Sequence, residues 1–260
     1  MGQDRVVRVT SGSGRRGALL GLAGAVLSAA SCAGPTSDGA SPTSAAFPAG
    51  ALPLASAALG SAALHAVGEG GETGGLLGTA VCVAPGLVAC AAHSLPPGAR
   101  SVVLRAAHLG GPREVAVLGR GSASDVAFLA DAGHALTPVL SRAERPLAGA
   151  PVWAAGNPVF GPATASGAVE HPDAVLPGFG RGFTARLPAL MGYSGGPVVD
   201  EDGRLRGLVS ALPEPGGAGA LALLAGFDLA GLARGRPAPR RVFALSMDTV
   251  LGEARALGLA

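Results

Sequence analysis

One serine lies between glycines in the C-terminal part of the chain. Residues 191–198 read MGYSGGPV, so Ser194 lies in a glycine-rich turn that precedes a β-branched run. A serine hydroxyl becomes a useful nucleophile only when a base takes its proton and donors stabilise the oxyanion that forms. Because glycine has no Cβ, Gly192 and Gly195 allow a tight turn that aims backbone N–H groups at one point. This segment predicts nucleophilic acyl transfer at Ser194.

Two upstream segments supply an acid–base pair for that serine. Residues 88–93 (VACAAH) place His93 at the end of an apolar strand, and residues 124–129 (SDVAFL) place Asp125 at the start of another. A histidine accepts the serine proton and later protonates the leaving group, while a buried carboxylate fixes its tautomer. Asp131 is a nearby competitor, but it follows its strand in a polar turn. We therefore assign Asp125 as the partner of His93.

Composition restricts the class of protein. The chain has 260 residues, of which 48% are hydrophobic and 14% are charged. This length and composition suit one large domain or two small ones with a real core. All 19 basic residues are arginine, and the formal net charge is +2. Without the residues that precede Cys32, the chain has 15 arginines and 16 aspartates and glutamates, so its net charge is −1. No basic stripe remains, which argues against a nucleic-acid partner.

The N-terminus has the pattern of an export signal. Arginines precede a short apolar segment, residues 17–30, which is shorter than the about 20 residues that span a membrane. The pair Arg15-Arg16 is compatible with a twin-arginine route. Residues 29–32 (AASC) are similar to a bacterial lipobox, with Ala29 where leucine is commonest. Residues 1–32 thus predict export to the periplasm, envelope or exterior, either with a lipid tether on Cys32 or after ordinary cleavage nearby.

The rest of the chain divides into a linker and a β-rich domain. Residues 33–56 are rich in Ala, Ser, Pro, Gly and Thr and predict a flexible linker. Residues 57–260 contain many short apolar runs separated by Gly or Pro, which favours a sandwich or barrel. These runs are 79–83, 87–91, 101–105, 114–118, 126–129, 151–155, 164–169, 182–185, 197–199 and 205–210.

Two segments near the C-terminus differ from this pattern. Residues 248–257 carry a helical stripe of apolar residues, with Asp248 placed to cap the start and Gly258 to end the helix. Residues 213–241 are rich in Gly, Ala, Pro and Arg, and they fit either a hairpin with a long tip or a loop that partly covers a cleft.

Two cysteines lie in a predicted hairpin. Cys82 and Cys90 flank Pro85-Gly86 within apolar runs, and a three-residue loop centred on Gly86 would place them opposite one another. In an oxidising compartment this arrangement would allow a disulfide. The alternative is two small buried thiols, because free cysteine packs well as a small hydrophobe.

These segments together resemble the trypsin-like serine peptidases, most closely the bacterial HtrA/Deg type. The similarity covers roughly residues 60–258 and preserves the order of the family's motifs. The matching segments are 78–93 around the histidine, 119–127 around the aspartate, 151–158 (PVWAAGNP), 192–197 around the serine, and 243–250 at the transition from strand to helix.

The resemblance implies an all-β fold of two packed six-stranded antiparallel β-barrels, of about residues 57–140 and 141–260, with a C-terminal helix. His93 and Asp125 would come from the first barrel and Ser194 from the second, with the site in the cleft between them. The backbone N–H groups of Gly192 and Ser194 would form the oxyanion hole. Ser210 would support the aspartate and line the substrate backbone.

Some positions depart from the family pattern. Tyr193 replaces the usual Asp or Asn and would either reshape or anchor the oxyanion loop, and Cys90 replaces a usual threonine. No PDZ domain is expected, since the chain ends with the helix.

The resemblance also places the specificity pocket, which determines the substrate residue before the scissile bond (P1). Its base would be Pro188, and its wall Ala211 and Leu212. None of these is a carboxylate, so we expect a small or medium apolar P1 residue. Arg186 complicates this prediction, because it could attract an acidic P1 residue instead.

The most consistent interpretation is an exported serine endopeptidase that acts on proteins or peptides through an acyl-enzyme. The alternatives are a catalytically inactive or latent fold that binds peptides or proteins at the envelope, and an esterase with the same triad. No cofactor is expected. The remaining histidines have no metal-ligand spacing, so no metal site is expected either. These are His65, His108, His134 and His171.

Overall fold

The computed structural model describes residues 53–68, 70–211 and 239–260, apart from the side chain of Ala211. All of them belong to one compact unit, Ala46–Ala260. The predicted export signal with Cys32, nearly all of the predicted linker and Leu212 lie outside the described residues, as does most of segment 213–241. None of the helices in the described ranges is long and apolar enough to cross a membrane.

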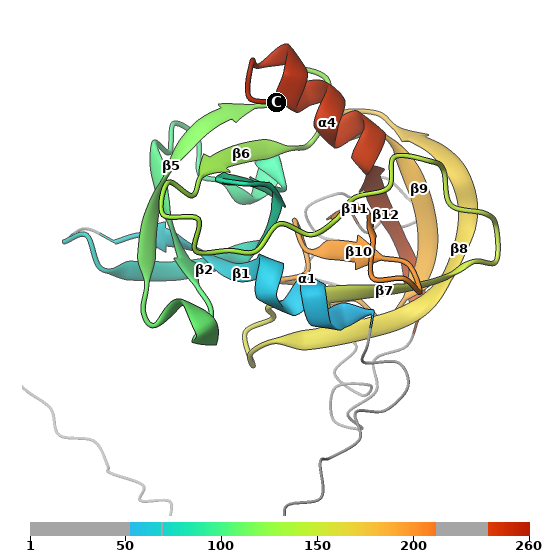
Figure 1. Ribbon diagram of the computed structural model, residues 1–260, viewed down its shortest axis with the longest axis horizontal. Coiled ribbons are helices and arrows are strands. Elements are labelled where there is room, and N and C mark those ends of the chain that lie inside the picture. Colours follow the sequence, from blue (N-terminus) through green and yellow to red (C-terminus); the bar gives the residue numbers. More distant parts are fainter. Residues whose placement is uncertain (1–52, 69, 212–238) are drawn as a thin grey trace, which may run out of the picture. The chain divides into compact units, whose positions relative to one another are not determined.

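Twelve strands in the described residues form two closed antiparallel barrels of six strands each, side by side in Figure 1. The first has the order β1-β2-β3-β6-β5-β4 and the second β10-β11-β12-β9-β8-β7. The predicted fold class is thereby confirmed. The first barrel comprises β1 (Ser61–Val67), β2 (Thr73–Ala84), β3 (Leu87–Cys90), β4 (Ser101–Arg105), β5 (Arg113–Arg120) and β6 (Ala127–Ala130). The second comprises β7 (Pro151–Gly156), β8 (Ala163–Leu176), β9 (Gly180–Leu187), β10 (Pro197–Val199), β11 (Leu205–Ala211) and β12 (Arg240–Ser246).

Helices lie at the two ends of the described chain. Helix α1 (Leu54–Gly60) begins inside the segment predicted as linker. The prediction missed this helix because its residues are mostly small and form no helical stripe, although Leu54 is buried. Helix α4 (Met247–Ala256) follows β12, and each of its ends lies within one residue of the predicted helix 248–257. Its N-cap is Ser246, whose Oγ accepts from the N–H of Thr249 at 3.4 Å, and Asp248 instead lies in the first turn.

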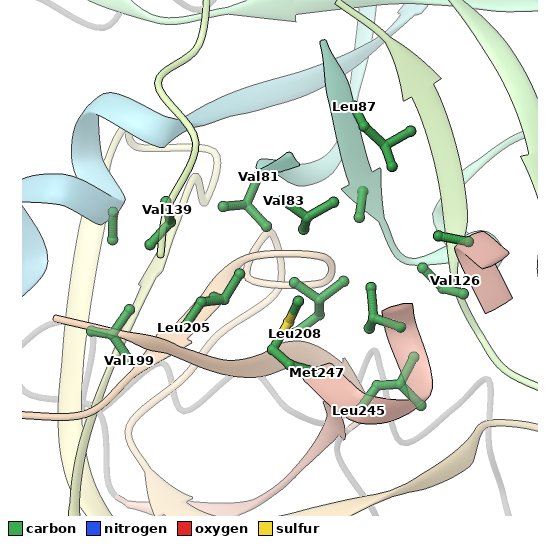
Figure 2. Packing of buried hydrophobic residues seen from close by; sticks show 14 of the residues in the cluster. Val81, Val83, Leu87, Val126, Val139, Val199, Leu205, Leu208, Leu245 and Met247 are labelled. Carbon is green, nitrogen blue, oxygen red and sulfur yellow. The ribbon is translucent and has the colours of Figure 1, made fainter. Parts of the chain in front are cut away.

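Strand alternation creates three separate apolar clusters. On β2, Ala80 and Cys82 point into the first barrel, whereas Val81 and Val83 point toward the second. A second cluster fills the second barrel. The third lies between the barrels, where Val81, Val83 and Leu87 meet residues of β11, β12 and α4 such as Leu208, Leu245 and Met247 (Figure 2). Each such buried side chain contributes about 1.5–3 kcal/mol, so this cluster fixes one barrel against the other.

The hairpin of the two cysteines differs from its prediction. Ala84 pairs with Leu87, so Pro85 and Gly86 form a two-residue turn rather than a three-residue loop. Together with a bulge between Cys82 and Ala84, this turn places Cys82 opposite Val88 and Cys90 opposite Ala80, and the expectation that the cysteines face one another is wrong. Both thiols are free and buried. Burial, with a smaller contribution from nearby carboxylates, raises the pKa of Cys82 to about 11 and that of Cys90 to about 12.

Candidate active site

The first barrel positions a histidine–carboxylate pair. His93 lies in the 3₁₀ turn η1 (Ala92–Ser94) that follows β3, and Asp125 lies just before β6. Asp125 Oδ2 is 2.7 Å from His93 Nδ1 and accepts from Ser210 Oγ at 2.5 Å, while Oδ1 accepts from the backbone N–H of His93 at 2.8 Å. Asp125 is buried, but 34% of the His93 side chain is exposed. Both carboxylate oxygens are thus used, and the Nε2 edge of the imidazole is left to react.

Two side chains hold the histidine turn in place. Arg120 donates from its guanidinium to the carbonyl oxygens of Ala92 and Pro96, each at 2.8 Å. Phe179, between β8 and β9 of the second barrel, meets the His93 ring edge-on, with centroids 6.1 Å apart and planes inclined by 62°. Its carbonyl oxygen also accepts from the N–H of Asp125 at 3.0 Å. The acid–base pair is therefore braced from both barrels.

The terminal helix supports the loop that leads to Asp125. Glu253 of α4 accepts from the N–H groups of Ser122 and Ala123 at 3.1 and 3.0 Å, and from Ser124 Oγ at 3.0 Å. Burial alone would raise the pKa of Glu253, but these hydrogen bonds outweigh it and hold the pKa below its usual range. The carboxylate thus acts as a charged cap for this loop.

The second barrel presents Ser194 from a turn built on glycine. The N–H of Tyr193 donates to Leu190 O at 3.2 Å, and Gly192 has a φ of +97°. Met191 does not have a positive φ, so residues 190–193 form a type II turn, which favours glycine at its third position. A Cβ at Gly192 would also lie 2.6 Å from Pro158 Cα.

Two N–H groups of this loop are left without an internal partner. The N–H of Gly195 donates to Val209 O at 2.6 Å, and that of Gly196 donates to Tyr193 O at 2.7 Å. By contrast, the N–H groups of Gly192 and Ser194 make no hydrogen bond to any described residue. These are the two groups that the sequence predicted as oxyanion donors.

A threonine of the first barrel ties this loop down. The N–H of Thr79, on β2, donates to Ser194 O at 2.8 Å, and its hydroxyl donates to Gly192 O at 2.7 Å. The same hydroxyl accepts from the N–H of Asn157 at 2.9 Å. Thr79 is fully buried, so these bonds are shielded from water. A strand of one barrel thereby fixes the reactive loop of the other.

The serine loop and the histidine turn are neighbours. A Cβ at Gly195 would lie 2.8 Å from the backbone N of Ala91, so only glycine lets the loop approach the strand that leads to His93. A Cβ at Gly78 would lie 2.7 Å from Ser194 O and 3.3 Å from Ser94 Oγ. Among the described residues, no hydrogen bond joins the Ser194 hydroxyl to His93.

Tyr193 anchors the loop in the core of the second barrel. Its side chain is only 2% exposed and belongs to the cluster that fills this barrel. The ring packs on Gly156, where a Cβ would lie 2.7 Å from the ring Cδ1. Burial raises the pKa of the Tyr193 phenol to about 12. The bulky residue is thus accommodated by a glycine on the neighbouring strand.

Only some of the predicted specificity residues lie within the described part of the chain. Pro188 follows β9 and is half-buried, and Ser210 of β11 is bonded to Asp125. Ala211 ends β11, whereas Leu212 lies beyond the described segment. Arg186 is engaged elsewhere, since its Nε donates to Glu170 Oε1 at 2.9 Å. In the described part of the chain, no group of three or more His, Cys, Asp or Glu residues is arranged to hold a metal ion.

Five supporting residues were not assigned a role from the sequence: Thr79, Arg120, Asn157, Phe179 and Glu253. Thr79 and Asn157 lie within predicted strands or turns, but their partners are 78 or more residues away along the chain. Glu253 lies 129–131 residues from the loop that it caps. Such contacts leave no local periodicity, so a single sequence carries no signal for them.

The architecture defines a class of protein. Two six-stranded antiparallel barrels, with a histidine and an aspartate from one and a serine from the other, form the chymotrypsin-like fold of serine endopeptidases. The family model of the trypsin-like peptidase domain matches residues 78–208, which is half of the chain. The chain belongs to this family. A comparison with curated proteins found no match.

Solved structures of similar fold include HtrA-type proteases. The active form of the Rv3671c protease from M. tuberculosis is 21% identical with a TM-score of 0.62, covering 88% of this chain and 96% of that one. The HtrA-type protease AlgW, with a tripeptide, is 21% identical with a TM-score of 0.60, covering 81% and 64% respectively. The serine endoprotease from Yersinia pestis is 17% identical with a TM-score of 0.60, covering 81% and 66%. At these identities the likeness concerns the fold.

Proposed function

We propose that this protein is an exported serine endopeptidase that cleaves proteins or peptides with a triad of Ser194, His93 and Asp125. One observation carries the proposal. A histidine held by a buried carboxylate lies beside a serine turn whose Gly192 and Ser194 N–H groups have no other partner among the described residues. This arrangement combines a base with two donors for an oxyanion.

The chemistry follows from these groups. His93 Nε2 takes the proton of Ser194 as Oγ attacks the carbonyl carbon of the scissile peptide. The oxyanion that forms accepts from the N–H groups of Gly192 and Ser194. The imidazolium, stabilised by Asp125, then protonates the leaving amine, and an acyl-enzyme remains on Ser194. Water attacks the ester by the same route, which releases the acid and restores the serine. The Ser194 hydroxyl and His93 Nε2 have to come within hydrogen-bond distance when substrate binds.

We propose a small or medium apolar residue at P1. Pro188 and Ser210 bring no charge to the predicted pocket, and Arg186 is paired with Glu170 rather than free to attract an acid. A library of peptides that vary only at P1 tests this. We expect cleavage after small apolar residues, and a strong preference for Lys or Arg would contradict the assignment.

We also propose export, on the basis of the arginines, the apolar segment 17–30 and the small residues that precede Cys32. Mass spectrometry of the mature N-terminus after expression in a bacterium tests this. Cleavage before Cys32 with an added acyl mass indicates a lipid tether, and cleavage nearby without it indicates a free exported protein. An intact N-terminus in the cytoplasm would contradict export.

The experiment on function is labelling with a fluorophosphonate, which reacts with activated serines. We expect wild type to be labelled, Ser194→Ala not to be labelled, and the control Ser166→Ala, which alters an exposed serine of β8, to behave as wild type. Equal labelling of wild type and Ser194→Ala would remove Ser194 as the nucleophile. No labelling of any of them, with no cleavage of casein, would favour an inactive binding protein.

A further inference from the structure

A cavity adjoins the candidate active site. It has a volume of about 890 Å³ and lies between the outer face of the first barrel and the turn that joins β7 to β8. Its first-barrel wall includes His65, Arg105 and His108, and its second-barrel wall includes Asn157 and Val159. None of the described residues that line it is an aspartate or glutamate.

The register of the first barrel connects this cavity to the reactive loop. Thr79 on β2 pairs with Ala63 on β1, and Ala63 pairs with Arg105 on β4. The flanking Ala62 and Leu64 point into the barrel interior, so these three residues share its outer face. Adjacent strands lie about 4.8 Å apart, which puts the Cα of Arg105 about 10 Å from that of Thr79. Thr79 in turn holds the carbonyl of Ser194.

The cavity lies on the leaving-group side of Ser194. The N–H of Gly195 attaches the reactive loop to β11 through Val209 O, and that flank carries Ser210. On the other flank the N–H of Asn157 donates to Gly192 O at 3.2 Å, and Asn157 lines the cavity. The substrate residues before the scissile bond, which form the acyl part, are expected beside Ser210 on the β11 flank. The residues after the scissile bond therefore run toward Asn157 and Arg105.

Arg105 is available for a ligand, unlike the arginines that are held in ion pairs. It is exposed and makes no hydrogen bond or ion pair to any described residue. By contrast, Arg186 and Arg241 both pair with Glu170, and Arg145 and Arg181 both pair with Asp173. A guanidinium presents a fork of donors that matches a carboxylate. His65 Nδ1 forms a hydrogen bond with Gly74 O at 3.1 Å, which leaves the other ring nitrogen, Nε2, free.

We propose that this cavity binds the part of the substrate that follows the scissile bond and selects an acidic side chain there through Arg105. An extended peptide advances about 3.3 Å per residue, so the acid would be the second, third or fourth residue after the bond. Exposed Val159 adds an apolar contact at the rim. This inference rests on the proposed peptidase function and names its substrate class.

Pairs of quenched fluorescent peptides test it. Each pair is identical except for Glu or Gln at the second, third or fourth position after the scissile bond, and the ratio of their kcat/KM values is measured within each variant. We expect wild type to favour Glu about two- to fivefold at one or more of these positions. Arg105→Ala should bring the ratio to about one, and Arg105→Glu should reverse it. The control Arg255→Ala, an exposed arginine of α4 that does not line the cavity, should keep the wild-type ratio.

A binding measurement separates this inference from the function on which it rests. Fluorescence anisotropy compares the affinity of Ser194→Ala for the same labelled peptides, with and without Arg105→Ala. A wild-type ratio near one at all three positions, or a ratio that survives in Arg105→Ala, overturns the inference. If no peptide is cleaved while the Glu peptide still binds better through Arg105, the peptidase assignment fails and the proposed site for an acidic side chain stands.

Discussion

The two barrels contribute to the site in different ways. The first barrel supplies the side chains of His93 and Asp125. A hydrogen bond between these side chains joins them, and one substitution can alter that bond without moving the backbone. The second barrel supplies Ser194 and the backbone that presents it, since the turn at residues 190–193 depends on the φ of Gly192 and offers main-chain N–H groups. The first half is consequently open to chemical alteration, whereas the second half is sensitive to shape.

Each half is nevertheless held by the other barrel. Asp125 is bonded to Ser210 of β11 and to the carbonyl of Phe179, which are both from the second barrel. Ser194 and Gly192 are bonded to Thr79 of β2 in the first. The apolar cluster between the barrels therefore determines the geometry of the site as well as the stability of the fold (Figure 2).

The largest effect should come from altering the side-chain half by one atom. In Asp125→Asn the amide keeps the shape of the carboxylate but stabilises the wrong tautomer of His93, so we expect kcat to fall about 10⁴-fold. Steady-state kinetics on a peptide substrate measures this, with thermal unfolding as the check on the fold. A loss below about tenfold would mean that Asp125 does not orient the base.

The next effect should come from reshaping the backbone half. In Gly192→Ala the new Cβ meets Pro158 and opposes the positive φ, so the turn opens and the oxyanion loses a donor. We expect kcat to fall by a factor on the order of 10²–10³. The control Met191→Ala changes the neighbouring exposed residue of the same turn and should retain turnover. Similar kinetics in both variants would argue against Gly192 as a donor.

A smaller effect should come from the tie between the halves. Thr79→Val keeps the shape but removes the hydroxyl that bonds Gly192 O and Asn157, so we expect kcat to fall about tenfold with little change in KM. Thr79→Ser retains the hydroxyl and should restore most of the turnover. Equal losses in both variants would indicate a packing role for Thr79 rather than positioning.

The smallest effect, on stability instead of turnover, should come from the helix that caps the Asp125 loop. Glu253→Gln keeps the shape but loses the charge, so we expect the free energy of unfolding to fall by about 1 kcal/mol at pH 7. Folding lowers the pKa of Glu253, so its stabilisation is present above the unfolded value of about 4.3 and is lost as the pH falls further. The difference between wild type and Glu253→Gln should therefore shrink at acid pH in urea titrations.

A control variant identifies the source of that difference. Glu201→Gln removes an exposed carboxylate outside the loop and should match wild type across the pH range. If Glu201→Gln and Glu253→Gln behaved alike, the charge of the protein as a whole would be responsible, and the hydrogen bonds from Ser122 and Ala123 would not.

The sequence carried strong signals for the barrels and for the reactive groups. Short apolar runs between Gly and Pro predicted most strands, and the motifs around His93, Asp125 and Ser194 had the order of the family. Strand β1 was missed because its apolar positions are diluted by alanine and His65, and α1 because its residues are small. The cysteine register was wrong because the turn has two residues instead of the three expected, and a bulge near Val83 shifts the pairing by one residue more.

The residues that hold the site could not be predicted in the same way. Thr79, Asn157 and Glu253 act through single hydrogen bonds between segments that are distant in sequence, and neither composition nor periodicity encodes such pairs. Tyr193 was recognised as unusual, but its role depends on Gly156, which makes room for the ring on a neighbouring strand. Only the folded barrels bring these partners together.

The most direct test of the central claim is to trap the acyl-enzyme. Wild type mixed with an activated ester should release one leaving group per chain in a rapid burst, and peptide mass spectrometry should find the acyl group on Ser194. In Asp125→Asn the burst should slow sharply while the site of acylation stays the same. An acyl group on any other residue, or a burst that persists in Ser194→Ala, would contradict the assignment of Ser194 as the nucleophile.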